Sequence, residues 1–278
     1  MKKFLAVFDG YKMSKSTLEY AIQLTKAVDA HLVGVFLDDF LYRNYSVYKV
    51  VTNYDNYEKV MKTLDAKDKS KREAAVLQFQ RACGKAGIHF SIHRDKSVAI
   101  QELKRESMFA DLIIINENET FTRYREQAPT RFMKDLLRDV QCPVLVVSNN
   151  FKPVDKIVLL YDGRPASLHA IKMFSYLFGN LRDIPVEVFT VKDLQEASLR
   201  LPDNKLMREF IKRHFPTAEY HVEKGIAEQT IVGHLVNRSE NELVVLGAYQ
   251  RSELSRLFKT SMADILMKEV DTPLFYCA

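Results

Sequence analysis

The sequence has few cysteines, and they lie far apart. Cys83, Cys142 and Cys277 are the three cysteines of the chain, and no two of them form a CxxC pair. This spacing argues against a disulfide framework and against a cysteine-ligated zinc site. Cys142 and Cys277 lie in or beside apolar runs, so we expect them to be small buried side chains.

Long apolar segments and common catalytic motifs are also absent. No apolar run approaches the ~20 residues that a membrane helix needs, and the apolar run in MKKFLAVFDG is too short for a signal-peptide core. There is no GxxxxGK[ST] loop, no GxSxG elbow and no RNP, zinc-finger or helix-turn-helix pattern. We therefore expect a protein of the reducing cytoplasm, without a membrane segment, a nucleic-acid partner or a dedicated enzymatic activity.

The bulk composition is that of a globular protein. Hydrophobic residues make up 47% of the chain and charged residues 28%. The length of 278 residues suggests two domains. The net charge of +5 favours anionic ligands, but the basic residues are dispersed, which is typical of a solvated surface.

Short apolar runs alternate with segments of helical periodicity through the first half. This alternation predicts βαβ units and a parallel sheet. The expected strands are 4–8, 32–37, 88–93, 111–116 and 142–147, and the expected helices are 14–28, 58–86, 98–108 and 130–140.

The same series begins again after a linker at 148–153. Asp9-Gly10 after the first strand is matched by Asp162-Gly163, and Cys142-Pro143 before the last strand by Thr272-Pro273. The repeat predicts two doubly wound α/β domains, 1–148 and 154–278, with a ligand crevice at the carboxyl ends of the strands. The expected strands of the second copy are 157–161, 186–191, 218–222, 243–246 and 272–277, and the expected helices are 167–178, 206–214, 226–238 and 262–270.

A tyrosine-rich segment, residues 40–57, makes the first copy longer than the second. It carries five tyrosines, and it interrupts the βαβ pattern. Tyrosine combines a flat apolar ring with a polar tip, so the segment suits a lid, an interface or a loop packed on its own domain.

The stretch 242–262, ELVVLGAYQRSELSRLFKTSM, carries the clearest functional signal. An apolar strand ends at Gly247, a polar loop follows, and a helical period begins after Thr260-Ser261. A helix N-terminus presents unpaired N–H groups and a partial positive charge, so this layout suits a phosphate or another anion.

This stretch resembles the nucleotide-binding signature of the universal stress protein family, which is Gly, two residues, Gly, nine residues, then Gly followed by Ser or Thr. Gly247 matches the first glycine, Gln250 and Thr260 stand where the second and third would be, and Ser261 matches the hydroxyl residue. With the Asp-Gly pairs and the Pro-opened final strands, the resemblance covers nearly the whole chain.

The resemblance implies a tandem protein whose domains have the adenine nucleotide alpha hydrolase-like fold, each a five-stranded parallel sheet with helices on both faces. It also implies self-association through the fifth strands, either within the chain as a pseudo-dimer or in a homo-oligomer, and an unknown protein partner. The implied ligand is ATP or AMP in the second domain, with no metal beyond a nucleotide-associated Mg²⁺. The residues that the resemblance assigns to it are Asp162, Val191, Gly247, Gln250, Thr260 and Ser261.

The first copy has lost more of this signature. Asn116 and Glu119 stand at the first two glycine positions, and Pro129-Thr130 replaces the Gly-Ser pair. Glu117 and Glu119 would repel a triphosphate. We therefore expect no nucleotide there, and we expect Asp9 to have a structural role.

Other functions stay open. His89 and His93 share one face of a strand, but no third metal ligand lies near them in sequence, so we expect a surface or sheet-pairing role. The alternatives to a nucleotide-binding regulatory module are a nucleotide-free interaction scaffold and a slow ATP hydrolase in which Asp162 acts as a base. A further alternative is a lipid or small-acid ligand under the tyrosine-rich segment.

Overall fold

The computed structural model describes residues 1–10, 13–37, 57–95, 98–122, 125–179, 181, 183–237, 240–247 and 261–277. The tyrosine-rich segment predicted to be a lid, an interface or a packed loop lies outside these residues, apart from Tyr57. No helix in the described part of the chain is long and apolar enough to cross a membrane.

Ten strands form one sheet, in the order β3-β2-β1-β4-β5-β10-β9-β6-β7-β8. The first half contributes β1 (Lys3–Asp9), β2 (His31–Leu37), β3 (His89–Asp95), β4 (Leu112–Asn116) and β5 (Val144–Val147). The second half contributes β6 (Lys156–Leu160), β7 (Val186–Lys192), β8 (Glu219–Lys224), β9 (Glu242–Gly247) and β10 (Leu274–Cys277). Strands within each half pair in parallel, so the predicted α/β fold class is confirmed.

The two halves meet at β5 and β10, which pair antiparallel. The strand order of the second half is therefore the mirror of the first, and two five-stranded sheets become one continuous sheet. Pairing these two strands satisfies backbone groups that would otherwise form two exposed edges in the middle of the molecule.

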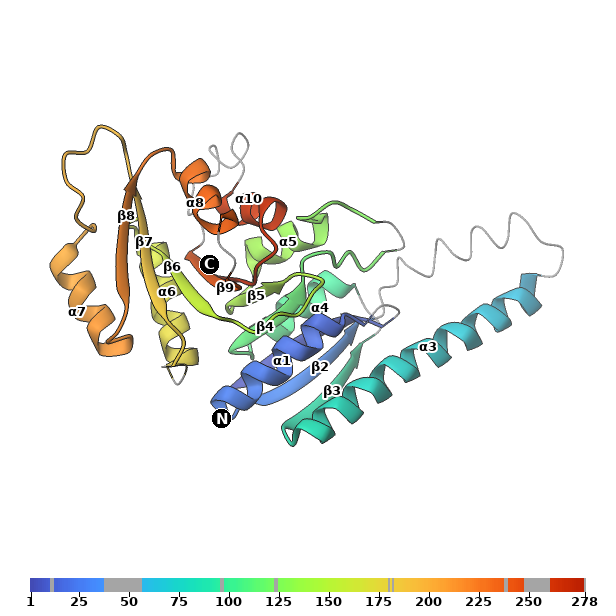
Figure 1. Cartoon of the computed structure of the whole chain (residues 1–278). Coiled ribbons are helices and arrows are strands. Elements are labelled where there is room, and N and C mark those ends of the chain that lie inside the picture. Colours follow the sequence, from blue (N-terminus) through green and yellow to red (C-terminus); the bar gives the residue numbers. More distant parts are fainter. Residues whose placement is uncertain are drawn as a thin grey trace.

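Helices cover both faces of this sheet (Figure 1). One face carries α1 (Lys15–Val28), α3 (Tyr57–Ala86), α6 (Pro165–Phe178) and α7 (Asn204–His214). The other face carries α4 (Ala99–Ser107), α5 (Arg131–Asp139), α8 (Ala227–Val236) and α10 (Met262–Glu269). Each face has its own buried apolar cluster, because successive strand residues point to opposite sides.

The long helix α3 packs on the sheet through its C-terminal part. The Phe79 ring lies edge-on to the rings of Phe8, Phe36 and Phe90, 5.8 to 5.9 Å away between centroids. A Cβ atom at Gly34 would come within 2.7 Å of the Phe79 ring, so the absence of a side chain on β2 lets α3 pack closely. Figure 1 shows the same helix extending past the sheet at its other end.

The segment predicted to link the two halves is fixed by side chains from both. The Asn241 amide donates to the carbonyl oxygens of Lys152 and Pro153, both at 2.8 Å, and the Tyr20 hydroxyl donates to the Lys152 carbonyl at 2.9 Å. The Tyr20 ring also contacts Phe151, 4.8 Å between centroids. These contacts hold the halves in one arrangement, in addition to the β5–β10 pairing.

The cysteines are buried free thiols, as the sequence predicts for Cys142 and Cys277. Burial raises the pKa of the Cys83 and Cys142 thiols to about 12 and that of Cys277 to about 11. These thiols therefore stay protonated and inert at neutral pH.

Candidate functional site

A pocket of about 200 Å³ opens in the second half at the carboxyl ends of β6, β7 and β9. The chain runs from β6 outward through β7 and β8 and then returns to the other side of β6 as β9. The pocket therefore lies where the strand order reverses, which is the usual ligand position in open α/β sheets. Its lining residues are Leu160, Tyr161, Asp162, Arg164, Pro165, Ala166, Ser167, Phe189, Val191, Ala227, Ile231, Leu246, Gly247 and Met262.

Three of the sequence-predicted residues meet in this pocket. Asp162 follows β6, Val191 is near the end of β7, and Gly247 ends β9; all three line it. Most of the other wall residues are apolar, which gives a slot suited to a flat uncharged group with polar groups at its rim.

Gly247 has a steric reason to be glycine. A Cβ atom built there would lie 2.3 Å from the carbonyl oxygen of Ala166 and 2.6 Å from the amide nitrogen of Ser167. The first turn of α6 therefore approaches the end of β9 at a distance that only glycine permits. The same close approach forms one side of the pocket.

Three helix N-termini border the pocket. Pro165, Ala166 and Ser167 begin α6, Ala227 begins α8 and Met262 begins α10, and all five line the pocket. Among the described residues, no side chain of the N-cap position caps α6 or α8. Their N-terminal partial positive charge therefore favours an anion at the rim.

Asp162 also shapes the turn that leads into α6. Its Oδ1 accepts from the Arg164 amide N–H at 2.9 Å and from the Ser167 hydroxyl at 2.6 Å. The neighbouring Tyr161 hydroxyl has a raised pKa, mainly because of burial and also because of nearby Asp203 and Asp162. Tyr161 therefore remains neutral at physiological pH and can donate a hydrogen bond.

Ser261 has a structural role in α10. Its Oγ accepts from the Asp264 amide N–H at 3.1 Å, and its own N–H donates to Asp264 Oδ2 at 3.3 Å. This capping box confirms the predicted N-cap. Its neighbour Met262, rather than Ser261, lines the pocket, and the predicted ligands Gln250 and Thr260 lie outside the described residues.

Several pocket residues were not found from the sequence. Phe189 lies two residues before Val191 on the same face of β7, so strand alternation was a usable signal. Ala227 and Ile231 come from α8, four residues apart on one helix face. Only the packing of α8 over β7 brings them to the pocket, and no sequence pattern indicated that contact.

The equivalent position in the first half is polar. The hollow beyond β4 is lined by Ser14, Lys15, Asn116, Asn118, Glu119, Thr120, Arg125, Glu126 and Asn149. Asn116, at the position of Gly247, is buried; its amide donates to the Ser148 carbonyl at 3.1 Å and its Oδ1 accepts from the Asn118 N–H at 3.0 Å. Here the first helix, α1, has an N-cap: the Ser14 Oγ accepts from Thr17 N–H at 3.1 Å.

Thr130 has a structural role in the first half, and Asp9 is buried there. Thr130 caps α5 by accepting from the Met133 N–H at 3.2 Å, and its hydroxyl donates to the Glu119 carbonyl at 2.6 Å. Asp9 is buried at the end of β1.

Glu117 has a pKa raised to about 7, chiefly by burial and also by the nearby Asp271 carboxylate.

Comparison with known proteins agrees with this architecture. No protein-family model matches the chain. A curated universal stress protein of Synechocystis sp. is 21% identical over 165 residues, and this match spans 59% of the chain and 56% of the relative.

Two solved structures align along nearly the full chain. A universal stress protein from Archaeoglobus fulgidus is 14% identical with a TM-score of 0.67, covering 99% of this chain and 97% of that one. A putative universal stress protein from Pseudomonas aeruginosa is 16% identical with a TM-score of 0.64, covering 100% of this chain and 93% of that one. The fold is that of universal stress proteins, and the resemblance predicted from the residues is confirmed.

Proposed function

We propose that this chain is a tandem universal stress protein that acts as a stress-response binding and regulatory module. Its two domains are 1–148 and 154–278. The second domain binds ATP or AMP in the pocket beyond β6, β7 and β9. The first domain is a degenerate partner that binds no nucleotide and completes an internal pseudo-dimer through β5 and β10. Further copies would associate into a homo-oligomer in the cytoplasm.

The observation that carries the proposal is the combination of an apolar slot with converging helix N-termini. The walls formed by Phe189, Val191 and Ile231 suit the two faces of a flat base. Asp162 lies at the rim, in reach of a ribose hydroxyl as the resemblance implies. The N-termini of α6 and α8, which have no N-cap side-chain hydrogen bond, favour phosphate on the same side.

Gly247 supports the same assignment. It keeps the end of β9 close to α6, and it begins the loop to which the resemblance assigns phosphate binding through Gln250, Thr260 and Ser261. In this proposal Ser261 contributes by capping α10, so that the helix starts where the phosphates lie, with Mg²⁺ accompanying them.

The first experiment is to identify what copurifies with the protein. The chain is purified, denatured and its supernatant analysed by mass spectrometry, followed by thermal unfolding with millimolar ATP, ADP and AMP. Ligand at a hundredfold above its dissociation constant adds about 2.7 kcal/mol to the free energy of unfolding. A nucleotide near one per chain, or a saturable rise in Tm, supports the proposal.

A pair of variants on α8 tests the location. Ala227→Trp places a bulky ring at a position that lines the pocket, and it should abolish the nucleotide-dependent rise in Tm. Glu228→Trp places the same ring one residue on, at an exposed position outside the lining, and should leave the rise unchanged. If both variants bind nucleotide like the unmodified protein, the pocket is not the site.

Absence of any bound or titratable nucleotide would instead favour an interaction scaffold. Slow hydrolysis is tested separately by phosphate release. Release that is lost in Asp162→Ala would assign a hydrolase, whereas release that persists would indicate a contaminating enzyme.

A further inference from the structure

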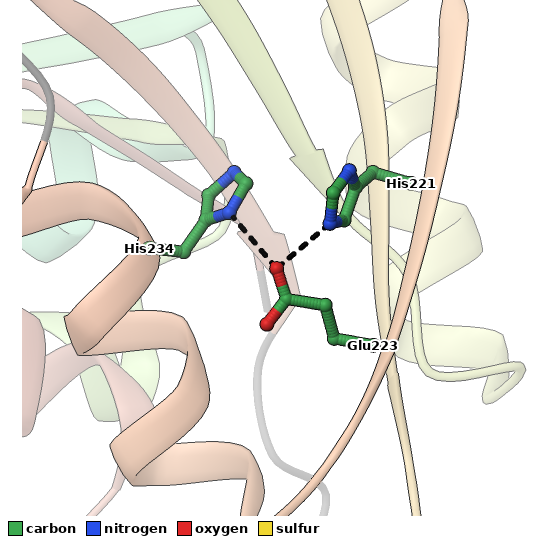
Figure 2. A group of neighbouring side chains, drawn as sticks. All are labelled: His221, Glu223 and His234. Atoms are coloured by element: carbon green, nitrogen blue, oxygen red, sulfur yellow. Dashed lines mark hydrogen bonds and ion pairs between the residues drawn. The ribbon is translucent and has the colours of Figure 1, made fainter.

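A histidine–glutamate cluster lies beside the pocket, under α8. Among the described residues, His221, Glu223 and His234 are the group of potential metal ligands whose ligating atoms all lie within 4.8 Å of one another. His221 and Glu223 are two residues apart on β8, so their side chains share a face, and His234 reaches them from α8 (Figure 2).

The Glu223 carboxylate lies between the two imidazole rings. Its Oε1 is 2.7 Å from His221 Nε2 and 3.6 Å from His234 Nδ1. Figure 2 draws both contacts as dashed lines. Ligand atoms around a tetrahedral Zn²⁺, with bonds of about 2.0 to 2.2 Å, are separated by roughly 3.3 Å. The two Glu223 contacts, at 2.7 and 3.6 Å, lie on either side of this separation, and the Glu223 side chain is 39% exposed and so has room to move outward.

The far sides of both rings face a second carboxylate. Glu187 Oε1 lies 3.2 Å from His234 Nε2 and 3.9 Å from His221 Nδ1. The Glu187 side chain is 3% exposed and its other oxygen pairs with Lys156. These are ion-pair contacts, and the 3.2 Å contact does not have hydrogen-bond geometry. A carboxylate behind the ring raises the basicity of a metal-binding histidine, and here one carboxylate faces both rings.

Aromatic packing holds the rings in this orientation. Phe189 stacks on His234 at 3.9 Å between centroids and 23° between planes, and it lies 5.4 Å from His221. The His234 side chain is 5% exposed. The His234 imidazole so positioned loses little conformational freedom when it binds an ion, which favours affinity.

The charge balance also favours a cation. With neutral imidazoles, Glu187 and Glu223 carry two negative charges and Lys156 compensates one of them. Two histidines with one carboxylate, and a fourth position left for water, form a donor set that suits Zn²⁺. Mg²⁺ and Ca²⁺ prefer all-oxygen sites, so the set discriminates against the commoner hard cations.

We propose that His221, Glu223 and His234 bind a divalent transition-metal ion, with Zn²⁺ as its natural probe, and that Glu187 positions the two histidines. The Phe189 ring lines the pocket and also stacks on His234, so the two sites share one side chain. The proposal does not depend on nucleotide binding and stands if the pocket is empty of nucleotide.

The test is a zinc titration of the full chain. The protein is freed of metal by a chelator, dialysed, and titrated with Zn²⁺ against a chromophoric indicator, with bound metal counted by mass spectrometry. One zinc per chain is expected. Glu223→Gln and His234→Gln should weaken binding by at least about 100-fold, and Glu187→Gln by about 10- to 100-fold.

A matched control exists in the first half. His93 Nδ1 lies 2.7 Å from Glu106 Oε1, which is the same pair of groups at the same distance, and no third ligand joins them in the described part of the chain. His93→Gln should therefore bind zinc like the unmodified protein. Co²⁺ in place of Zn²⁺ should give visible absorption typical of a tetrahedral site, and this absorption should be lost in Glu223→Gln.

Two results would overturn the proposal. One is the absence of saturable zinc binding to the metal-free protein. The other is zinc binding whose affinity is unchanged in Glu223→Gln and His234→Gln. Circular dichroism checks that each variant folds; Glu223 is partly exposed, so its variant remains informative if Glu187→Gln does not fold.

Discussion

At the end of β9 the second half has Gly247, and at the end of β4 the first half has Asn116. The glycine allows α6 to approach and leaves an apolar pocket beside it. The asparagine uses its side chain to bind Ser148 and Asn118, and a polar hollow results. At this equivalent position, glycine therefore lies beside an apolar pocket and asparagine beside a polar hollow, although the two halves share one architecture.

The N-terminus of the first helix, which is α1 in the first half and α6 in the second, also differs between the halves. Ser14 caps α1 in the first half, whereas no N-cap side chain caps α6 in the second. A capped N-terminus has already satisfied an N–H group that a ligand anion would use. Ser14 thus satisfies an N–H group of α1 within the first half, whereas the N-cap side chain of α6 satisfies none in the second, and the following predictions test that contrast.

The largest effect is expected at Gly247. Gly247→Ala forces a Cβ atom to within 2.3 Å of the Ala166 carbonyl oxygen, so we expect a loss of about 3 kcal/mol in the free energy of unfolding. Gly233→Ala is the matched control, because Gly233 lies inside α8 with nothing within 4 Å of the added atom. It should stabilise the protein by about 1 kcal/mol. Urea denaturation measures both, and equal effects would contradict the steric argument.

Intermediate effects are expected at the two hydroxyl residues of equivalent position. Thr130→Ala removes an N-cap and a bond to the Glu119 carbonyl at a fully buried position, and should cost about 2 kcal/mol. Ser261→Ala removes an N-cap at a partly exposed position, and should cost about 1 kcal/mol. A reversed order in denaturant midpoints would show that Ser261 has the larger structural role.

The smallest effect concerns Glu117 and depends on pH. Its pKa of about 7 lies above the ordinary value of 4.5, because burial and Asp271 disfavour the charged form. Its contribution to stability is therefore fully present below the ordinary value and is lost as pH rises through about 7. Glu117→Gln should be more stable than the unmodified protein by about 1 kcal/mol above that pH, a reduced figure because the residue is partly exposed to solvent.

The control for this prediction is the neighbouring carboxylate. Asp271→Asn removes the second cause of the shift, so it should reproduce part of the gain at high pH. Unfolding free energies measured across the acid-to-neutral range would show it. Identical pH profiles for Glu117→Gln and the unmodified chain would contradict the assignment.

Much of the fold followed from local pattern. The apolar run at 243–246 became β9, and Ser261 became the N-cap of α10, because a strand period or a cap is encoded within a few neighbouring residues. Of the predicted site residues, Asp162, Val191 and Gly247 meet in one pocket. Their binding of nucleotide stays a prediction, as do the assignments of Gln250, Thr260 and Ser261.

The group of potential metal ligands shows a feature that the sequence alone did not predict. His89 and His93 were considered as ligands because they are close in sequence, yet the structure pairs His93 with Glu106. His221, Glu223 and His234 were missed, because one of the three comes from a different element whose docking decides the distance.

By itself, the sequence determined the order of strands and helices, the repeat of that order and the end of β9 at Gly247, because each depends on interactions between near neighbours. Only the tertiary structure decided that the two sheets join into one, that α8 closes a pocket over β7, and that Glu187 lies behind two histidines. These features depend on how side chains distant in sequence pack against one another, and packing depends on shape and volume across the whole fold.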